Sequence, residues 1–436
     1  MSEADQQLAS ARRLAAEERA DEAADAYRAA RAQAPAEAAE YLGLHAVRRQ
    51  RWTEAAETLE QAARLAPANL AVLESLGLAC ERVGAFPRAR EALQRVLDTD
   101  PQRFVARLVL GFVEQRLGRP QAGMAHMYWA FRQAQERGFW TDAGTVQPWL
   151  QDHVRGAAAF ITRCQQDLLQ GALKGAAGDL RRVEAFIRSQ LGLERQLSPD
   201  PRQAPKKHYF PGLPPSPWLD PALFPWAARL EQAFPEILAE YLSVAGADLG
   251  FESFLTFRSA EQVAQYLGTT GPAPAWNAFF FYRHGVRDDD NCRRCPKTAA
   301  LLDELPLIRL PGTTPEICFS TLTPGSHILP HRGDANLRSV VHLGLVVPPS
   351  CVLKVAGEER SWGPGKLLAF DDTYEHEAWN RSDSVRAVLL MDAWNPHLTD
   401  PERSALPRVI GAMNEIAAEL ERQKPVANAA GPVAPR

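Results

Sequence analysis

The chain has 436 residues, of which 46% are hydrophobic and 23% are charged, so we expect about two or three folded domains of a soluble protein. The formal net charge of −4, with both signs interspersed, gives no indication of nucleic-acid binding. No apolar run approaches the roughly 18 residues of a membrane span, and the acidic start is unlike a secretory signal. Six scattered cysteines indicate reduced thiols and a cytoplasmic location.

Residues 1–138 contain an internal repeat. A Leu-Gly pair recurs every 34 residues, at Gly43, Gly77 and Gly111. A 34-residue period of paired helices, with small residues where the helices cross, is typical of tetratricopeptide repeats. We therefore predict an α-helical tetratricopeptide solenoid whose concave face binds a peptide or partner protein. The alternative is that the repeats only pack against the rest of the chain or make it dimerise.

The next segments lack that repeat. Residues 139–195 keep a helical pattern and are predicted to form a helical cap or connector. Residues 196–217 are rich in proline and are predicted to form an extended linker. A helix is expected to start at Asp220, a plausible N-cap with Pro221 behind it, and to run to about residue 244.

Residues 218–402 change to short strands separated by turn residues. The expected strands are 277–283, 316–323, 339–347, 351–356, 366–370 and 385–393. Many short strands at this spacing favour a double-sheet jelly roll. Residues 403–424 read as an amphipathic C-terminal helix, and residues 425–436 as a disordered tail. The predicted fold class is a multidomain α + β protein.

Three residues in the strand-rich region form a candidate metal site. His331 lies just before an apolar segment, His376 follows about 45 residues later, and Arg386 stands on the next expected strand. Two imidazoles that hold Fe(II), with coordination positions left open, are typical of non-haem iron enzymes. A guanidinium suits the distal carboxylate of 2-oxoglutarate, because it can donate two parallel hydrogen bonds.

The motifs around these residues carry a resemblance. They are Phe319-Ser320, Pro324-Gly325, Pro330-His331-x-Gly333, Asn336, His342-Leu343-Gly344-Leu345, Gly365-Lys366, Phe370-Asp371-Asp372, Glu375-His376-Glu377, Trp379, Arg386 and Asp392-x-Trp394. Their order and spacing resemble the aspartyl/asparaginyl β-hydroxylase family of 2-oxoglutarate oxygenases, with milder similarity reaching back to about residue 209. The resemblance implies a double-stranded β-helix that uses Fe(II), 2-oxoglutarate and O2 to hydroxylate the β-carbon of Asp or Asn in a peptide.

The resemblance also assigns roles in the site. It implies that His331 and His376 bind the metal, that Arg386 and Ser320 hold the distal end of 2-oxoglutarate, and that His342 contacts its chelating carboxylate. Most iron oxygenases have a carboxylate two residues after the first histidine. This chain has Gly333 at that position. The family that it resembles is recognised by the absence of this carboxylate.

Other residues near the candidate metal site are expected to have different roles. Asp334 is expected to point away from the metal, because side chains alternate along an extended segment. In the best-known family members an arginine stands at the position of Val340, so one carboxylate contact is absent here, and Arg338 is the candidate to replace it. Asp371 and Asp372 are expected to fix the turn that orients His376.

A cationic loop follows the strand at 277–283. Arg293, Arg294 and Lys297 are candidate contacts for an acidic peptide substrate, and a solvated charged surface is the alternative. The pair Cys292 and Cys295 is a weak zinc motif, because no second pair accompanies it.

Alternatives to this activity stay open. They are hydroxylation of a free amino acid, of another peptide residue or of a lipid acyl chain, and a non-catalytic role in which the repeats bind a partner.

Overall fold

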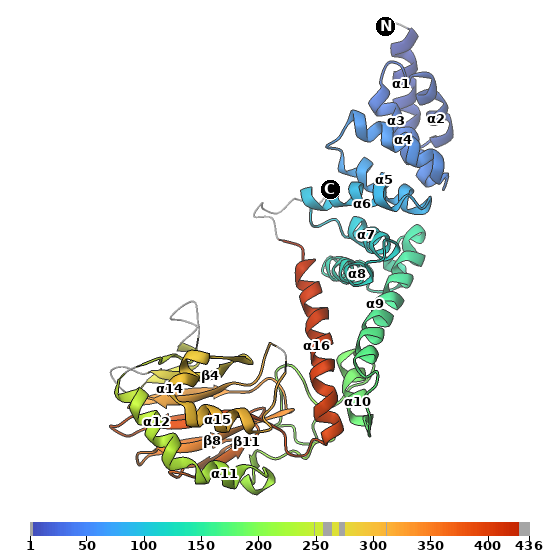
Figure 1. Cartoon of the computed structure of the whole chain (residues 1–436). Helices are drawn as coiled ribbons and strands as arrows, with labels where there is room; N and C mark the ends of the chain where they lie inside the picture. The colour runs from blue at the N-terminus through green and yellow to red at the C-terminus, as the bar shows by residue number, and fades with distance from the viewer. Residues whose placement is uncertain (1–2, 248, 256–263, 270–274, 311, 427–436) are drawn as a thin grey trace. The chain divides into compact units, whose positions relative to one another are not determined.

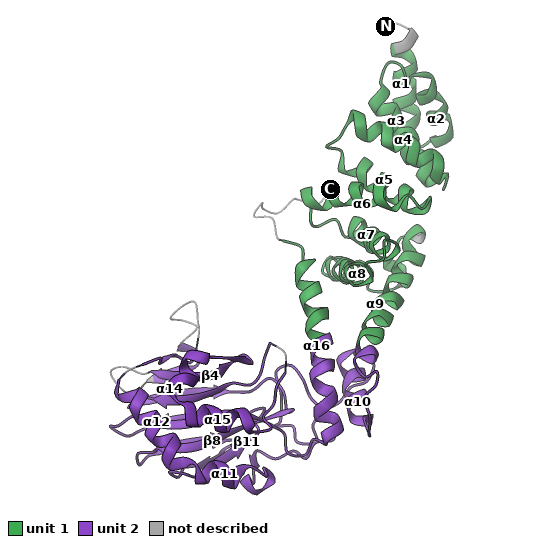
Figure 2. Ribbon diagram, viewed as in Figure 1, with its two compact units in different colours: residues 1–168, 413–436 green, residues 169–412 purple. Residues whose placement is uncertain are grey.

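The computed structural model describes residues 3–247, 249–255, 264–269, 275–310 and 312–426. These residues form two compact units (Figure 2). Unit 1 comprises residues 1–168 and 413–436, and unit 2 comprises residues 169–412. No helix in the described ranges is both long and apolar enough to cross a membrane.

Unit 1 is built from helices that pack in consecutive pairs (Figure 1). The helices are α1 (Glu3–Ala16), α2 (Ala20–Ala29), α3 (Pro35–Arg48), α4 (Trp52–Leu65), α5 (Leu70–Arg82), α6 (Phe86–Thr99), α7 (Phe104–Arg116) and α8 (Pro120–Gln135). The helical N-terminal part of the predicted fold class is thereby confirmed.

The repeated glycines lie where the two helices of a pair cross. A Cβ atom placed on Gly77 would stand 2.4 Å from Cγ of Leu93, so only glycine lets α5 and α6 approach this closely. The equivalent pairs are Gly43 with Leu59 and Gly111 with Met127. Both members of each pair recur with the 34-residue period, which explains why the period is visible in the sequence.

The last part of unit 1 comes from residues 151–168 of α9 (Gln151–Ala172) and residues 413–422 of α16 (Asp400–Arg422), and the remaining residues of both helices belong to unit 2. Leu420 on α16 packs partly buried against the core of α7, α8 and α9. Its carbonyl accepts a 2.7 Å hydrogen bond from the indole of Trp129, and Arg107 donates to the carbonyl of Gln423 over 3.1 Å. The short helices η1 (Ala143–Thr145) and η2 (Pro148–Leu150) precede α9.

Unit 2 contains two antiparallel sheets (Figure 1). The eight-stranded sheet has the order β1-β11-β8-β13-β6-β4-β2 with β5 paired to β4, and the five-stranded sheet has the order β10-β9-β12-β7-β3. The strands are β1 (Trp218–Leu219), β2 (Glu252–Ser253), β3 (Leu267–Thr269), β4 (Trp276–Arg283), β5 (Val286–Arg287), β6 (Ile317–Leu322), β7 (Ser326–His331), β8 (Arg338–Val346), β9 (Cys351–Val355), β10 (Glu358–Arg360), β11 (Leu367–Phe370), β12 (His376–Asn380) and β13 (Arg386–Trp394). Antiparallel sheets in this unit agree with the prediction, but the two sheets are not closed into one barrel.

Each face of the eight-stranded sheet belongs to a different core, because side chains alternate along a strand. On β8, Val341, Leu343 and Leu345 join a core with the helices, whereas Val340 faces the five-stranded sheet. The helices of unit 2 are α10 (Arg181–Gln190), η3 (Pro221–Leu223), α11 (Ala227–Gln232), α12 (Phe234–Gly246), α14 (Asp289–Arg294) and α15 (Pro296–Glu304). Functional side chains on the inner face of the sheet therefore point into the space between the two sheets.

The single helix expected from Asp220 is divided into η3, α11 and α12. Asp220 does cap the first of them, since its carboxylate accepts from the backbone of Ala222 over 2.9 Å. Pro235 stands in the first turn of α12 and prevents the chain from continuing straight through from α11.

The proline-rich segment 196–217 belongs to unit 2 and is bonded to the loop between β7 and β8. The backbone N–H of Lys206 donates to the carbonyl of Gly333 over 3.0 Å, and that of His208 donates to the carbonyl of Asp334 over 2.9 Å. Phe210 is fully buried, and its N–H donates to the side chain of Asn336 over 2.7 Å. Bound in this way, the segment is no free tether between the two units.

Candidate functional site

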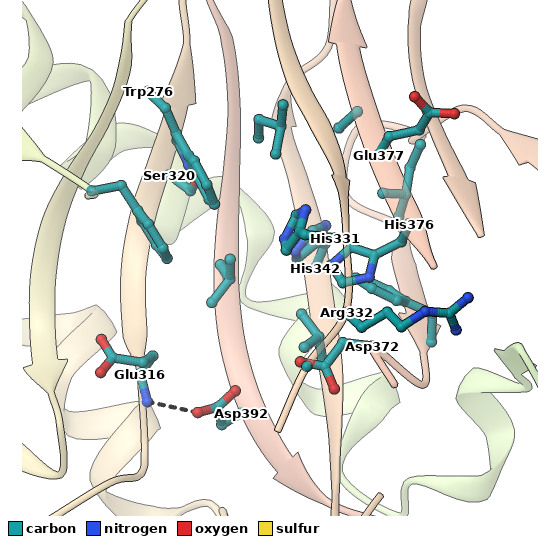
Figure 3. Close-up of a pocket in the computed structure, with 18 of the residues that line it drawn as sticks. Trp276, Glu316, Ser320, His331, Arg332, His342, Asp372, His376, Glu377 and Asp392 are labelled. Carbon is teal, nitrogen blue, oxygen red and sulfur yellow. Dashed lines mark hydrogen bonds between the residues drawn. The ribbon is translucent and has the colours of Figure 1, made fainter. Parts of the chain in front are cut away.

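A cavity of about 270 Å³ lies between the two sheets of unit 2 (Figure 3). The eight-stranded sheet contributes Ser320, His342 and Arg386 to its wall, and the five-stranded sheet contributes His331 and His376. Five residues predicted from the sequence to form the metal and cosubstrate site are therefore gathered around one space.

The two histidines face each other across neighbouring strands. His376, the first residue of β12, pairs with His331, the last residue of β7, and their ring centroids are 4.1 Å apart. Nδ1 of His331 donates to the carbonyl of Leu329 over 2.8 Å, and Nδ1 of His376 donates to the carbonyl of Tyr374 over 3.0 Å. These bonds fix the tautomer, so each Nε2 carries a lone pair, as a metal-binding imidazole requires. Burial lowers the pKa of both imidazoles, which keeps the lone pairs free of protons.

The carboxylate of Asp372 fills the space beside Gly333. A Cβ atom on Gly333 would stand 2.1 Å from Oδ2 of Asp372, so no larger residue fits there without displacing this aspartate. Oδ2 accepts from Nη2 of Arg338 over 2.5 Å, while Oδ1 is buried and has no hydrogen-bond partner among the described residues. Burial raises the pKa of Asp372 to about 7.

Arg386 is a buried cation without a counter-ion. Its side chain is 2% exposed, and no acidic side chain in the described part of the chain forms an ion pair with it. Nη1 makes a long 3.5 Å contact with the carbonyl of Ser320, Nε has no partner in the described ranges, and the guanidinium lies 4.8 Å from the ring centroid of Trp362. Burial lowers the pKa of Arg386 to about 10. A buried unpaired charge is costly, so this position calls for an anionic ligand.

His342 presents a second unsatisfied donor to the same cavity. The indole N–H of Trp362 donates to Nδ1 of His342 over 3.1 Å, and burial lowers the pKa of the imidazole to about 3. A neutral imidazole whose Nδ1 accepts must carry its proton on Nε2. That N–H is buried and lacks an acceptor within the described ranges, so it requires an oxygen ligand.

Ser320 completes the polar lining near Arg386. Its hydroxyl accepts a 2.9 Å hydrogen bond from the indole of Trp276, which leaves the hydroxyl proton free to donate.

The donor set fits Fe(II) together with 2-oxoglutarate. The two Nε2 lone pairs suit a divalent metal, and the unpaired guanidinium and the Nε2–H of His342 suit the oxygens of a dicarboxylate. Among the described residues, no group of three or more His, Cys, Asp or Glu side chains is placed to share a metal ion. A metal bound here would take its protein ligands from the two imidazoles.

Two of the neighbouring aspartates have partners outside the cavity. The carboxylate of Asp334 pairs with Lys207 over 2.6 Å, although the residue borders the cavity. Asp371 accepts from the backbone and hydroxyl of Thr373 and from the side chain of Gln203. Asp371 thus stabilises the turn before His376, as expected from the sequence.

The predicted cationic loop lies apart from the cavity. Arg293 pairs with Asp290 on α14, and Lys297 pairs with Glu236 over 2.8 Å. None of Arg293, Arg294 and Lys297 lines the cavity that contains the histidines. Cys292 and Cys295 are both buried and free, and their thiols are directed to different carbonyls, of Phe281 and Glu240.

The sequence did not point to Trp362, which orients His342 and stacks on Arg386. It stands outside any strand between β10 and β11, where no hydrophobic periodicity marks it. The pairing of Arg338 with two aspartates was also missed, because Asp372 and Asp392 lie far from it in the sequence.

Comparison with known proteins confirms the resemblance. The sequence model of the aspartyl/asparaginyl beta-hydroxylase family matches residues 231–396, and the tetratricopeptide repeat model matches residues 8–69 and 42–104. The human aspartyl/asparaginyl beta-hydroxylase is 38% identical over 139 residues, which are 31% of this chain and 18% of that protein.

Two further relatives cover more of the chain. The ornithine lipid ester-linked acyl 2-hydroxylase of Rhizobium tropici is 36% identical over 190 residues, which are 43% of this chain and 63% of that protein. Aspartate beta-hydroxylase domain-containing protein 2 of Xenopus tropicalis is 31% identical over 238 residues, which are 52% of this chain and 60% of that protein. The chain thus spans less than two thirds of each relative.

Proposed function

We propose that the chain is an Fe(II)- and 2-oxoglutarate-dependent dioxygenase that hydroxylates an unactivated C–H bond, with a double-stranded β-helix as its catalytic fold. The observation that carries the proposal is the unpaired, buried guanidinium of Arg386 in the same cavity as two imidazoles with free Nε2 lone pairs. The match to a hydroxylase family over residues 231–396 supports it.

In this mechanism the chain holds and orients its ligands. His331 and His376 would hold the metal through Nε2, because their Nδ1 atoms are engaged by backbone carbonyls. Arg386 and the hydroxyl of Ser320 would hold the distal carboxylate of 2-oxoglutarate, and the Nε2–H of His342 would donate to its other end. When bound, Fe(II) and 2-oxoglutarate supply, with O2, the oxidising chemistry that places oxygen in a C–H bond. The buried walls keep water away from that chemistry.

Two substrate classes are supported by the names of the relatives. The family description supports hydroxylation at the β-carbon of Asp or Asn in a peptide, and the name of the relative in Rhizobium tropici supports hydroxylation of a lipid acyl chain.

Metal and cosubstrate binding test the proposal. Titration of the anaerobic protein with Fe(II) and then 2-oxoglutarate should give one equivalent of each, and air should then produce succinate. His331→Ala should lose iron, whereas Arg386→Ala should keep iron and lose 2-oxoglutarate. A wild-type protein that binds iron but shows no affinity for 2-oxoglutarate would refute the proposal.

The repeats of unit 1 have a groove that supports a binding role. It has a volume of about 570 Å³, and Trp52, Leu78, Val109, Trp149 and Arg48 are among the residues that line it. Trp149 is 51% exposed, and aromatic and arginine side chains are typical of binding surfaces. We propose that this groove binds a peptide or protein that carries or accompanies the substrate.

A variant of the full chain tests this role. Trp149→Ala should slow hydroxylation of a protein substrate and leave hydroxylation of a short peptide unchanged. Leu65→Ala is the matched control, because Leu65 is 52% exposed and does not line the groove. Equal rates on the protein substrate for both variants would mean that the groove plays no part.

All six cysteines are unpaired and buried. Unpaired thiols are typical of a reducing compartment, which supports the cytoplasm as the proposed location.

A further inference from the structure

We propose that the group oxidised in the cavity is uncharged and aliphatic, and that the cavity discriminates against a side-chain carboxylate. This inference rests on the proposed function, because it concerns the part of the cavity that the metal and 2-oxoglutarate leave free. It follows from the charges and the apolar residues that line the wall.

The guanidinium of Arg338 is already neutralised. Nη1 donates to Asp392 over 2.7 Å, and Nη2 donates to Asp372 over 2.5 Å. Asp392 is fully buried, and Asp372 is 3% exposed. Both ends of this guanidinium are occupied by buried carboxylates, so Arg338 is not free to bind a substrate carboxylate in place of the arginine that family members have at the position of Val340.

The other two arginines of the wall are also committed. Nη1 of Arg332 donates to the carbonyls of Arg202 and Thr373, and its Nη2 lies 3.7 Å from Glu375. Arg386 is assigned to the distal carboxylate of 2-oxoglutarate. Arg332 is 30% exposed, so among the described residues that line the cavity no fully buried, unpaired cation is left for a carboxylate of the substrate.

The remaining carboxylates of the wall have partners of their own. Glu377 is bonded to His327 over 3.0 Å and to Lys354 over 3.1 Å, and Glu316 accepts from the backbone of His284 over 2.7 Å. Glu377 is paired with the cation of Lys354, and burial raises the pKa of Glu316, so these groups neither require a cationic substrate nor offer a partner to an anionic one. A carboxylate buried beside them would lose its hydration without gaining a partner.

The rest of the wall is apolar. Val340 is 7% exposed and stands on the inner face of β8. Phe254 stacks on Trp276 with ring centroids 4.0 Å apart, next to Ser320. The other apolar lining residues are Ile328, Leu353, Trp362, Phe370, Ala378 and Leu390. Such a surface stabilises a hydrocarbon group through burial of apolar area.

A saturated hydrocarbon group occurs in two kinds of substrate. It is present in the acyl chain of a lipid and in an aliphatic side chain of a peptide. The cavity wall recognises the methylene groups that both share, so the experiment must include both.

A competition experiment on the full chain with Fe(II) and 2-oxoglutarate tests the inference. The probes are an equimolar set of capped peptides that differ only in a central Leu, Ile, Asn, Asp or Glu, together with dihexanoyl phosphatidylcholine. Mass spectrometry then identifies each probe that gains one oxygen. We expect the Leu or Ile peptide, or the acyl chain of the lipid, to be oxidised at least about 100-fold more than the Asp and Glu peptides. Whether a peptide or the lipid gains the oxygen then shows which kind of substrate the cavity takes.

Preferred oxidation of the Asp or Glu peptide would overturn the inference. So would the absence of any oxidised aliphatic or acyl probe from a protein that still converts 2-oxoglutarate to succinate. Failure of the proposed function is a different result, because the anaerobic protein would then not bind 2-oxoglutarate at all.

Val340→Arg gives an independent test of the charge argument. The added guanidinium would give the cavity a second cation on β8, opposite Asp392 in the register of the sheet, that can bind a carboxylate of the substrate. We expect the Asp-to-Leu ratio of oxidised peptide to rise by at least about tenfold. Val340→Met, of similar length but uncharged, should leave that ratio unchanged. The same increase in both variants would show that size and not charge sets the preference, and would overturn the inference.

Discussion

Two buried arginines of the cavity are predicted to affect stability in opposite directions. Burial lowers the pKa of Arg386 to about 10, and at roughly 1.4 kcal/mol per pKa unit the folded protein holds this cation at a cost of about 3 kcal/mol. Arg386→Met removes the cost and also removes the contact with Trp362, which is worth about 1 kcal/mol. The free energy of unfolding of the ligand-free protein should therefore rise by about 2 kcal/mol.

Arg338→Met is the matched control. It leaves Asp372 and Asp392 buried without their cation, which should lower the free energy of unfolding by about 3–5 kcal/mol. Urea unfolding and thermal melting of the full-length variants, with and without 2-oxoglutarate, measure both effects. The ligand should stabilise the wild type and leave Arg386→Met unchanged. If Arg386→Met destabilises the ligand-free protein by 1 kcal/mol or more, roughly the scale of one hydrogen bond, Arg386 is a structural residue and not a ligand anchor.

The remaining predictions concern the metal site and its support. His331→Ala should abolish iron binding in a metal titration. Asp334→Ala should keep iron binding, because that carboxylate is paired with Lys207. If both variants lose iron equally, the assignment of the metal ligands is refuted. Gly333→Ala should lower the melting temperature, since the new Cβ would overlap Asp372, and adding Asp372→Ala should restore part of the loss; no restoration would contradict this packing argument. Trp362→Phe should weaken 2-oxoglutarate binding by about tenfold, because His342 loses the donor that fixes its tautomer; unchanged affinity would exclude that role.

The parts of the fold that were predictable are those with strong periodicity. The helices of unit 1 repeat because one glycine in each pair lets two helices cross, so the signal is local and regular. Most strands of the eight-stranded sheet were found, because long apolar runs mark strands that are covered on both faces. Strand β7 was missed, since Pro330 interrupts its pattern, and β12 was missed because it is short and carries charged residues.

The site was predictable where it depends on motifs and not where it depends on tertiary pairing. His331, His376 and Arg386 were identified from order and spacing, and the structure gathers them around one cavity. That Asp372 fills the space beside Gly333 depends on the contact between the β7–β8 loop and the β11–β12 loop, which no local pattern reveals. The prolines of residues 196–217 suggested a linker, but proline content does not show whether the neighbouring N–H groups bond to solvent or to a sheet.

The charges around the cavity bear on which substrate it takes. Bound Fe(II) and the dianion of 2-oxoglutarate cancel each other, so the balance is set by the protein. The cavity is lined by three guanidinium groups, Arg332, Arg338 and Arg386, and by five carboxylates, Glu316, Asp334, Asp372, Glu377 and Asp392. Asp334 and Glu377 pair with Lys207 and Lys354, Arg338 pairs with Asp372 and Asp392, and burial raises the pKa of Glu316 and Asp372. Burial lowers the pKa of the three histidines, so they add no positive charge. A carboxylate on the substrate would be buried among groups that are already paired, whereas an uncharged aliphatic group would need no partner.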